Sequence, residues 1–514
     1  MQLHICNQLL ACVLLYFMPL WHSCISKPPH IVFIVADDYG YNDIGYHGSE
    51  ILTPNLDKLS AQGVRLENYY VQPICTPTRS QLMSGRYQIH TGLQHSIIWP
   101  PQAACLPLED KTIADALKTA GYATHMIGKW HLGQYKKECF PNHRGFDSFF
   151  GFLTGSGDYF KHRHVGCGIT MNPACSYWTG WDLRENDKPV HDYDGIYSTH
   201  LFTQRAQKII QEHDKTKPLF MYQSYQAVHG PLQVPDEYLV PYQNVTDRYR
   251  RIYSGMVTCM DEGIGNLTQT LHDTGLWDDT IIIFSTDNGG EIYAGGNNWP
   301  LRGWKHSLWE GGIHGVGFVS GPPLPDKMKG TSNNGLMHVS DWFPTIVGGL
   351  AGASLNGTKL DGVDMWHSIS TGAASPRKEI LHNIDPLTVT PVPCSTPIVS
   401  SDNKTFNTSI RAAIRVGDWK LITGDPGNGT WFPVPNSGNI PRKNTDLPDK
   451  RVWLFNIADD PREFNDLSEY HPDIVDQLFN RLQEHYTDSV PVFYPDGDPK
   501  ADPARHNDTW SDWE

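Results

Sequence analysis

Beyond its first 26 residues the sequence has no long apolar stretch, which excludes a membrane-spanning helix there. Positive charge is also scarce: 41 Lys and Arg residues stand against 56 Asp and Glu residues, giving a net charge of −15. This shortage excludes non-specific nucleic-acid binding, which needs basic surface. An anionic substrate would therefore be attracted by a local basic pocket and not by the charge of the whole protein. No internal repeat and no low-complexity segment occurs, which excludes a repeat architecture.

The N-terminus holds one apolar stretch, Leu9 to Trp21, which is too short to cross a bilayer. Small residues at Cys24-Ile25-Ser26 follow it, and together they predict a signal peptide at residues 1–26, although no Lys or Arg precedes the stretch. Glycosylation is predicted by seven N-x-S/T triplets, which begin at Asn244, Asn266, Asn356, Asn403, Asn407, Asn428 and Asn507. We therefore expect a protein of the secretory pathway, lysosomal or secreted, with no membrane partner.

Alternating apolar runs and helical patterns predict an α/β fold for residues 27–380. The run Ile31 to Ala36 is apolar without a break, as in a strand that is buried on both faces of a parallel sheet. Because strands and helices alternate, the central sheet is predicted to be mostly parallel and flanked by helices. Further strands are expected at 122–127, 218–225, 280–286 and 315–320, and helices at 53–63, 108–121 and 249–272.

The pattern changes after residue 380. Pro and Ser are frequent from 386 to 401, which predicts a long loop. Short alternating runs follow at 410–421 and 452–457, and then an amphipathic helical pattern at 472–486. These features predict a smaller C-terminal α+β domain, residues 381–514, built on an antiparallel sheet.

Acidic and amide side chains follow two of the expected strands. Asp37 and Asp38 come directly after the first, and Asp287 and Asn288 come directly after the strand at 280–286. Ligands bind parallel sheets outside the carboxyl ends of the strands, and oxygen ligands of this kind suit Ca²⁺, with Mg²⁺ as an alternative. A single acidic pair after a strand is often only a helix cap, but two pairs favour a metal site. Without a cation, three clustered carboxylates would repel one another.

Cys75 lies in an unusual turn, Cys75-Thr76-Pro77-Thr78-Arg79, with a helical pattern behind it. This places the cysteine at a helix N-terminus, where free N–H groups and the helix dipole favour anions. The thiol pKa is expected to fall there. The alternative is an ordinary buried or reactive cysteine.

Basic residues also follow strand ends. Lys129 and His131 alternate after the strand at 122–127, so both side chains can point to one side. His229 follows the strand at 218–225, and Lys305 lies further along the chain. A lone Lys or His is usually a surface or satisfied core residue. Together with Arg79, however, these residues supply the positive charge and hydrogen-bond donors that a tetrahedral anion requires.

The full run C-x-P-x-R-S-x-L-x-S-G-R, which starts at Cys75, resembles the signature of type I sulfatases, the formylglycine-dependent family. The resemblance extends from Pro29 nearly to the end of the chain, and it is closest to arylsulfatase B (N-acetylgalactosamine-4-sulfatase)-like arylsulfatases. It implies an alkaline-phosphatase-like α/β fold. Further blocks that carry it are Ala36-Asp37-Asp38, Gly85-Arg86-Tyr87-Gln88, Gly128-Lys129-Trp130-His131, Ser285-Thr286-Asp287-Asn288-Gly289-Gly290 and Trp309-Glu310-Gly311-Gly312.

The resemblance implies a sulfatase that hydrolyses aryl sulfates and sulfated sugars or glycosaminoglycans. A formylglycine-generating enzyme would oxidise Cys75 to formylglycine (3-oxoalanine), whose hydrated gem-diol is the nucleophile and forms a covalent sulfo-enzyme intermediate. One Ca²⁺ ion would bind this residue and a sulfate oxygen. The other calcium ligands are implied to be Asp37, Asp38, Asp287 and Asn288. Arg79 and Lys129 would orient the diol, and His131 would accept its proton. His229 and Lys305 would bind sulfate and help to protonate the leaving group.

Cysteine usage agrees with an oxidising compartment. Cys6, Cys12 and Cys24 belong to the predicted signal peptide, so six cysteines remain if Cys75 is modified. They predict the disulfides Cys105–Cys139 and Cys167–Cys175, a free buried thiol at Cys259, and no partner for Cys394. The chain departs from arylsulfatase B in lacking its cysteines near Pro101 and near Gly427-Asn428.

Two alternative functions are compatible with parts of this sequence. A phosphatase or phosphonate hydrolase on the same scaffold would bind two metals and lack the full Cys-x-Pro-x-Arg context. A secreted binding protein that has lost catalysis would lack one of the site residues, and all are present. Turnover of a chromogenic aryl sulfate separates the sulfatase from both. The loop at 159–193 diverges from arylsulfatase B, so the sequence does not predict the physiological sulfate ester. It does not predict the oligomeric state either.

Overall fold

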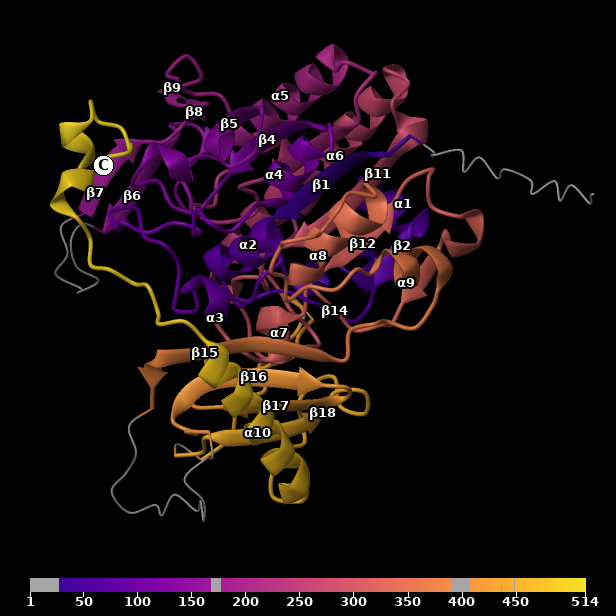
Figure 1. Cartoon of the computed structure of the whole chain (residues 1–514), viewed down its shortest axis with the longest axis vertical. Helices are drawn as coiled ribbons and strands as arrows, with labels where there is room; N and C mark the ends of the chain where they lie inside the picture. Colours follow the sequence, from indigo (N-terminus) through magenta and orange to yellow (C-terminus); the bar gives the residue numbers. More distant parts are fainter. Residues whose placement is uncertain (1–26, 168–176, 391–405, 436, 448) are drawn as a thin grey trace, which may run out of the picture.

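The computed structural model describes residues 27–167, 177–390, 406–435, 437–447 and 449–514. The predicted signal peptide, the predicted loop from 391 to 401, Cys175 and Cys394 lie outside these residues. A large sheet with helices on both faces forms the first part of the molecule, and a smaller sheet lies below it in Figure 1. Among the described helices, none combines the length and apolar character needed to cross a membrane.

The large sheet has ten strands in the order β13-β2-β12-β11-β1-β10-β4-β5-β8-β9. Its centre, β11-β1-β10-β4-β5, is parallel throughout, which confirms the predicted mostly parallel sheet. The strand bounds are β1 (His30–Ala36), β2 (Val64–Leu66), β4 (Ala123–Lys129), β5 (Ser148–Phe152), β8 (Arg184–Glu185), β9 (Lys188–Pro189), β10 (Leu219–Ser224), β11 (Thr280–Thr286), β12 (Gly317–Ser320) and β13 (Thr331–Asn333).

The strand expected at 315–320 is present as β12, but it runs antiparallel to β11. A parallel neighbour needs a crossover that carries the chain back to the opposite edge of the sheet. The segment between the two strands contains only a 3₁₀ turn and the short helix α7 (Glu310–Ile313). The chain therefore stays at the carboxyl edge and enters β12 from there.

Strand β1 shows why the apolar run is unbroken. Ile31, Phe33 and Val35 pack in one hydrophobic cluster, while Val32, Ile34 and Ala36 pack in the other. Alternate side chains point to opposite faces of a strand, so both faces of the sheet are buried. One face is covered by α1 (Pro54–Ala61), α5 (Ser198–Glu212) and α6 (Arg248–Asp273), and the other by α2 (Cys75–Ser84), α4 (Ile113–Thr119), α8 (Trp342–Pro344) and α9 (Trp366–Thr371).

Helix α4 begins at Ile113, five residues later than the expected start at 108. Thr112 provides the reason, because its hydroxyl accepts a hydrogen bond from the Asp115 backbone N–H at 3.1 Å. The Asp115 carboxylate in turn accepts one from the Thr112 N–H at 2.9 Å. This reciprocal cap fixes the first turn of the helix.

The smaller sheet is antiparallel, with the order β15-β16-β17-β18, as predicted. Its elements are β15 (Glu379–Val389), β16 (Ile410–Val416), β17 (Trp419–Thr423), β18 (Val452–Asn456) and the helix α10 (Pro472–Asp488). Residues 386–389, expected to be loop, belong to β15. Pro386 is tolerated there because it falls in a register irregularity between Asp385 and Val389, where no regular ladder bond is needed.

After α10 the chain returns to the large domain, which the sequence did not indicate (yellow in Figure 1). The Asp498 N–H donates to the Pro101 carbonyl at 2.7 Å, and the Trp510 N–H donates to the Trp181 carbonyl at 2.9 Å. The Trp510 side chain is completely buried. The C-terminal tail, residues 489–514, therefore joins the two parts of the molecule.

A buried ion cluster also joins them. Lys420 of β17 donates to Glu310 of α7 and to Glu463, with both Nζ–Oε1 distances at 2.8 Å and no solvent exposure of the three side chains. The second oxygen of Glu310 accepts from the Tyr70 hydroxyl at 2.8 Å. The small sheet thus provides a cation to Glu310 of the large domain and to Glu463 of its own domain.

Replacing Lys420 by Met should destabilise the protein by about 3–5 kcal/mol, because two buried carboxylates lose their cation. The matched control is Lys450→Met, which removes a partly exposed ion pair with Asp466 and should cost about 0–1 kcal/mol. Urea unfolding followed by tryptophan fluorescence measures both. Equal midpoints for the two variants would contradict this account of the interface.

Candidate active site

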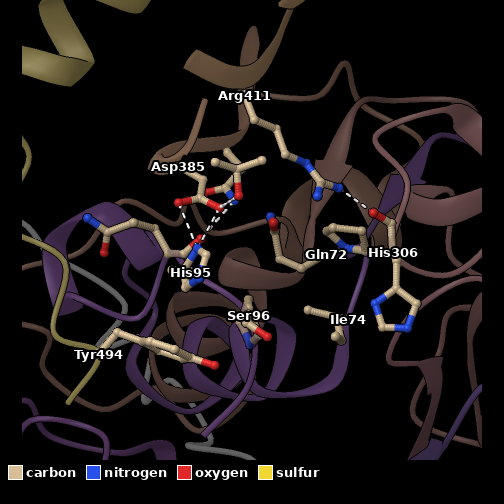
Figure 2. Close-up of a pocket in the computed structure, with 13 residues that line it drawn as sticks. Gln72, Ile74, His95, Ser96, His306, Asp385, Arg411 and Tyr494 are labelled. Carbon is tan, nitrogen blue, oxygen red and sulfur yellow. Dashed lines mark hydrogen bonds and ion pairs between the residues drawn. The ribbon is translucent and has the colours of Figure 1, made fainter. Parts of the chain in front are cut away.

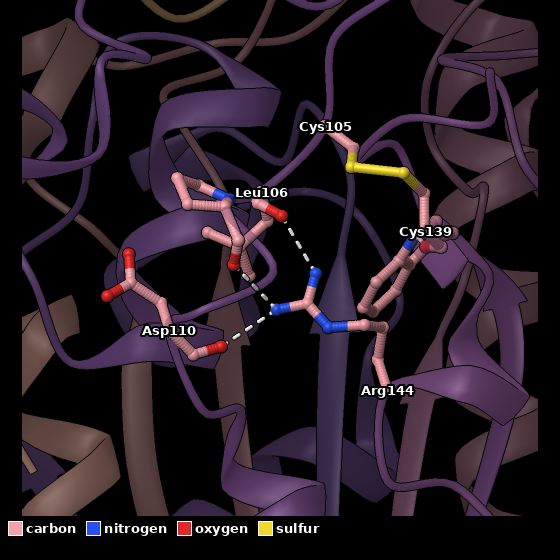
Figure 3. The surroundings of a disulfide bond; sticks show 7 residues. Cys105, Leu106, Asp110, Cys139 and Arg144 are labelled. Atoms are coloured by element: carbon pink, nitrogen blue, oxygen red, sulfur yellow. Dashed lines mark hydrogen bonds between the residues drawn. A yellow bond between two sulfur atoms is a disulfide. The ribbon is translucent and has the colours of Figure 1, made fainter. Parts of the chain in front are cut away.

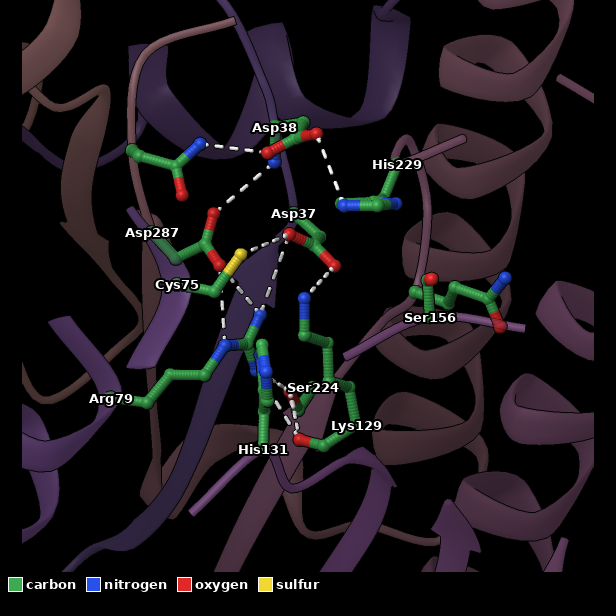
Figure 4. A network of polar contacts seen from close by, with 12 residues as sticks. Asp37, Asp38, Cys75, Arg79, Lys129, His131, Ser156, Ser224, His229 and Asp287 are labelled. Carbon is green, nitrogen blue, oxygen red and sulfur yellow. Dashed lines mark hydrogen bonds and ion pairs between the residues drawn. The ribbon is translucent and has the colours of Figure 1, made fainter. Parts of the chain in front are cut away.

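The carboxyl ends of β1 and β11 bring the predicted metal ligands together. The two strands pair in parallel with Ala36 opposite Thr286, so the residues that follow lie side by side. The Asp38 N–H donates to Asp287 Oδ1 at 3.1 Å, and Asn288 Nδ2 donates to Asp38 Oδ1 at 2.8 Å. Figure 4 shows Asp37, Asp38 and Asp287 converging on one place.

Each carboxylate of this cluster has its own basic partner. Lys129, the last residue of β4, lies 2.6 Å from Asp37, and Lys305 lies 2.7 Å from Asp38. The Arg79 guanidinium lies 2.8 Å from Asp287. All six side chains are at most 8% exposed. The formal charges of three carboxylates and three basic side chains therefore balance in this buried site, although burial and Asp287 raise the pKa of Asp37 to about 8.

Cys75 is the first residue of α2, as the sequence predicted, and its Sγ lies 3.6 Å from Asp37 Oδ1. The expectation of a lowered thiol pKa is wrong. Burial, together with Asp37 and Asp287, raises the pKa of Cys75 to about 12, although Lys129 acts in the opposite direction. Desolvation of the thiolate outweighs the helix N-terminus here. An unmodified Cys75 would remain a neutral thiol.

The two threonines of the Cys75 turn hold it in place. Thr76 Oγ1 donates to the His131 carbonyl at 3.1 Å, and Thr78 Oγ1 donates to the Asp287 carbonyl at 2.5 Å. One turn after Cys75, Arg79 Nη1 donates to Ser224 Oγ at 2.6 Å. Ser224 ends β10, and sequence reasoning missed it. Its position at a strand end, like Asp37 and Lys129, is the signal that could have identified it.

His131 and His229 differ in their surroundings. Burial, with Lys129 and Arg79, holds the pKa of His131 well below its usual value, so its ring is neutral. Its Nε2 faces the Ile98 carbonyl at 3.2 Å and carries the proton, which leaves a lone pair on Nδ1. Among the described residues, that buried Nδ1 has no hydrogen-bond partner.

The His229 ring points into the carboxylate cluster. Its Nδ1 faces the Gly230 carbonyl at 2.6 Å, so Nδ1 carries a proton and Nε2 is directed toward Asp38 Oδ2 at 3.5 Å. Burial, Lys305 and Lys129 lower the pKa of His229 to about 3, against the opposing effect of Asp38. The structure thus brings both histidines close to the basic residues of the site.

Two of these residues adopt backbone conformations that are rare for side chains other than glycine. Asp38 has φ +58° and His131 has φ +57°. Such conformations cost free energy and concentrate at functional sites. Gly128, before Lys129, has φ +98°, and a Cβ there would lie 1.8 Å from the Ser224 carbonyl oxygen. Only glycine allows β4 and β10 to approach this closely.

A cation fits the oxygen atoms of the cluster. Ligand atoms of Asp37, Asp38, Cys75 and His229 lie within 4.8 Å of one another. Asn288 Oδ1 is buried and has no hydrogen-bond partner among the described residues, as expected of a ligand atom. Asp287 is placed differently, since its oxygens accept from the Asp38 N–H and from Arg79.

The predicted disulfide Cys105–Cys139 is present next to the site (Figure 3). The Leu106 N–H donates to the Leu132 carbonyl at 3.0 Å, so the bridge fixes the segment that follows His131. Arg144 donates to the Leu106 and Asp110 carbonyls, each at 2.8 Å. Cys259 is a free buried thiol, as predicted. The predicted Cys167–Cys175 bridge lies outside the described residues.

Comparisons with known proteins agree with this site. The chain is 50% identical to arylsulfatase J of Mus musculus over 495 residues, covering 95% of this chain and 81% of that protein. It is 32% identical to arylsulfatase A of Homo sapiens over 377 residues, covering 69% and 70%. The crystal structure of Ps i-CgsB in complex with k-i-k-neocarrahexaose matches with a TM-score of 0.73 and 29% identity, covering 92% of this chain and 96% of that one.

The family model described as Sulfatase matches residues 29–353, which include all the site residues discussed above. This match and the two arylsulfatase relatives confirm the resemblance drawn from the sequence. Since the relatives are sulfate ester hydrolases, the comparisons also support an enzyme of that class. The chain belongs to the sulfatase family.

Proposed function

We propose that this protein hydrolyses sulfate esters with residue 75, oxidised from Cys75 to formylglycine, as the nucleophile, and with one Ca²⁺ ion held by Asp37, Asp38, Asp287 and Asn288. The observation that carries the proposal is the position of Cys75. It lies at a helix N-terminus, 3.6 Å from a carboxylate of the charge-balanced cluster that contains Arg79, Lys129 and Lys305.

The residues present fit both groups. A thiol whose pKa is near 12 is a poor nucleophile at physiological pH, so oxidation of Cys75 gives this buried position a chemical use. The side-chain oxygen of Asn288, which has no hydrogen-bond partner in the part of the chain that the structure describes, fits a hard cation. Formylglycine supplies a hydrated aldehyde whose oxygen attacks sulfur, and Ca²⁺ supplies Lewis acidity and a point of attachment for a sulfate oxygen.

Arg79 and Lys129 orient residue 75. Arg79 is fixed from both sides by Asp287 and Ser224, and Lys129 is fixed by Asp37, so neither side chain has to reorganise during the reaction. His131 accepts a proton at Nδ1, because its neutral ring presents that lone pair in a dry site.

Lys305 and His229 approach the cluster through Asp38. Burial lowers the pKa of Lys305, but the nearby Asp38 carboxylate raises it by more. Lys305 therefore stays charged and can hold an anionic sulfate. His229 directs Nε2 to the same carboxylate. We assign these two residues to binding of sulfate and to protonation of the leaving alcohol or phenol. His229 can donate from Nε2 once the negative charge of a bound sulfate raises its pKa above about 3.

Aryl sulfates and sulfated saccharides are the proposed substrates. Two relatives are named arylsulfatases, and a structural relative is solved with k-i-k-neocarrahexaose, an oligosaccharide. The proposed location is lysosomal or secreted. The six predicted glycosylation sites within the described residues have exposed asparagines, which supports passage through the secretory pathway. A formylglycine-generating enzyme is the proposed partner during biosynthesis.

The state of residue 75 tests the nucleophile. Protein expressed with the modifying enzyme is digested with trypsin, and the peptide from Leu66 to Arg79 is analysed by mass spectrometry. We expect a peptide lighter than the cysteine form, reactive with hydrazide and unreactive with iodoacetamide. Cys75→Ser should abolish multiple turnover of 4-nitrophenyl sulfate, because a sulfated serine lacks the second hydroxyl that expels sulfate. The control, Cys259→Ser, alters the other free buried thiol and should keep activity. Active enzyme with a fully alkylatable Cys75 would overturn the proposal.

Replacing Asn288 by Leu tests the metal. This change removes one oxygen ligand and leaves every charge of the cluster in place, so calcium affinity should fall by at least about 10-fold. Calcium titration of the chelated enzyme, read by restored activity and by calorimetry, measures the change. Asn334→Leu, the same change at an exposed asparagine outside the site, is the control. Unchanged affinity in Asn288→Leu, or full activity in enzyme shown by metal analysis to be metal-free, would contradict the assignment.

A further inference from the structure

A cavity of about 320 Å³ adjoins Cys75 and lies between the two domains (Figure 2). Ile74, which precedes Cys75, and His306, which follows Lys305, form one side of it. Asp385 of β15 and Arg411 of β16 form the side contributed by the small domain. Tyr494 of the C-terminal tail completes the wall. Its volume is within the range of about 300–1,000 Å³ typical of small-molecule sites.

Arg411 is the unexplained group of this cavity. Its guanidinium points toward the cavity and donates one hydrogen bond, to the His306 carbonyl. Its Nε is buried without a hydrogen-bond partner, and within the described part of the chain no carboxylate forms a salt bridge with it. By contrast Arg415, on the same strand, donates to Tyr70 and to the Gly417 carbonyl.

The neighbouring carboxylates do not neutralise Arg411. Asp385 and Asp425 lie near enough to favour its charged form, but burial outweighs them and lowers its pKa. The oxygens of Asp385 are already used, because one lies 2.9 Å from His95 Nδ1 and accepts from Thr388 Oγ1 at 2.7 Å. Arg411 is partly exposed, but its Nε is buried and it has no ion pair within the described residues, so an anion that arrives with the ligand would complete its pairing.

Other lining groups suit a saccharide. Gln94 Oε1 is a buried acceptor with no hydrogen-bond partner in the described residues, and it can receive a sugar hydroxyl. Asn383 and Ser96 add polar contacts, while Ile74 and Tyr494 present apolar surface to a ring. Such a mixture of apolar walls and a few polar groups is typical of ligand sites.

We infer that Arg411 binds a second anionic group of the substrate, so that the preferred substrate is a sulfated saccharide carrying a carboxylate or another sulfate close to the ester that is cleaved. This inference rests on the proposed sulfatase function. A substrate with a single sulfate leaves the Arg411 guanidinium without an ion pair, so the dianionic saccharide should bind more tightly.

Competitive inhibition of 4-nitrophenyl sulfate hydrolysis tests this inference, since it reports binding whether or not a saccharide is cleaved. The probes are N-acetylgalactosamine monosulfate, the same sugar linked to a uronic acid, its carboxyl-reduced analogue, and a disulfated N-acetylgalactosamine. Wild-type enzyme should prefer a dianionic probe over the monosulfate. Arg411→Gln should reduce that preference by about 10- to 100-fold, the loss expected for one charge-assisted hydrogen bond. Arg411→Lys should restore part of it.

The control is Arg248→Gln, which removes an exposed arginine that does not line the cavity and should leave the preference unchanged. Loss of preference on carboxyl reduction identifies the carboxylate as the second anion, whereas preference for the disulfated sugar identifies sulfate. Because the readout is a ratio of inhibition constants, it is independent of the fraction of active enzyme.

An active enzyme with no preference for dianions, or one whose preference survives Arg411→Gln, would overturn the inference. A wild-type enzyme with formylglycine at residue 75 but no aryl sulfate turnover would instead overturn the proposed function.

Discussion

The balance of three carboxylates against three cations at the carboxyl edge of the sheet is the constraint on which the site depends. Asp37, Asp38 and Asp287 are paired with Lys129, Lys305 and Arg79 away from water. Removing any one partner would leave an uncompensated buried charge. A divalent cation added to this neutral set gives an excess of two positive charges. The site would then require an anionic ligand, which a sulfate ester provides.

The balance depends on the fold at two levels. Parallel pairing of β1 with β11 in register places two acidic pairs side by side, and the parallel strands β4 and β10 add Lys129 and Ser224 at the same edge. Helix α2 covers one face of the sheet and places Cys75 and Arg79 in the cluster. Because these elements are buried, the side chains are held in place before any substrate arrives, and this preorganisation lowers the cost of stabilising developing charge.

The small domain has a separate role. Lys420 pairs with Glu310 of the large domain and with Glu463 of its own domain, and β15 and β16 form one wall of the cavity near Cys75. The C-terminal tail adds Tyr494 and then packs Trp510 against the large domain. The proposed catalytic centre is thus made by residues of the large domain, while residues of both domains line the neighbouring cavity. Substrate preference can therefore change without altering the catalytic cluster.

Much of this arrangement could be predicted from the sequence, because unbroken apolar runs mark strands buried on both faces and polar pairs mark their carboxyl ends. Asp37, Lys129 and Asp287 were found in this way. The direction of β12 could not be predicted, since it depends on where a long loop lies. Ser224 was missed because its only signal is its position at the end of an expected strand, and a serine there carries no charge. The Cys75 pKa was predicted in the wrong direction because local helix geometry favours the thiolate, whereas burial, a tertiary effect, decides against it. Arg411 was missed because its significance depends on which side chains from distant segments fail to pair with it.

A crystal structure of active enzyme, with anomalous diffraction data, would test the central claim most directly. The account predicts one calcium peak bonded to oxygens of Asp37, Asp38, Asp287 and Asn288. It also predicts that residue 75 has oxygen density in place of sulfur and contacts the same ion. Sulfur at residue 75 in crystals of active enzyme, or no ion within reach of these carboxylates, would contradict it.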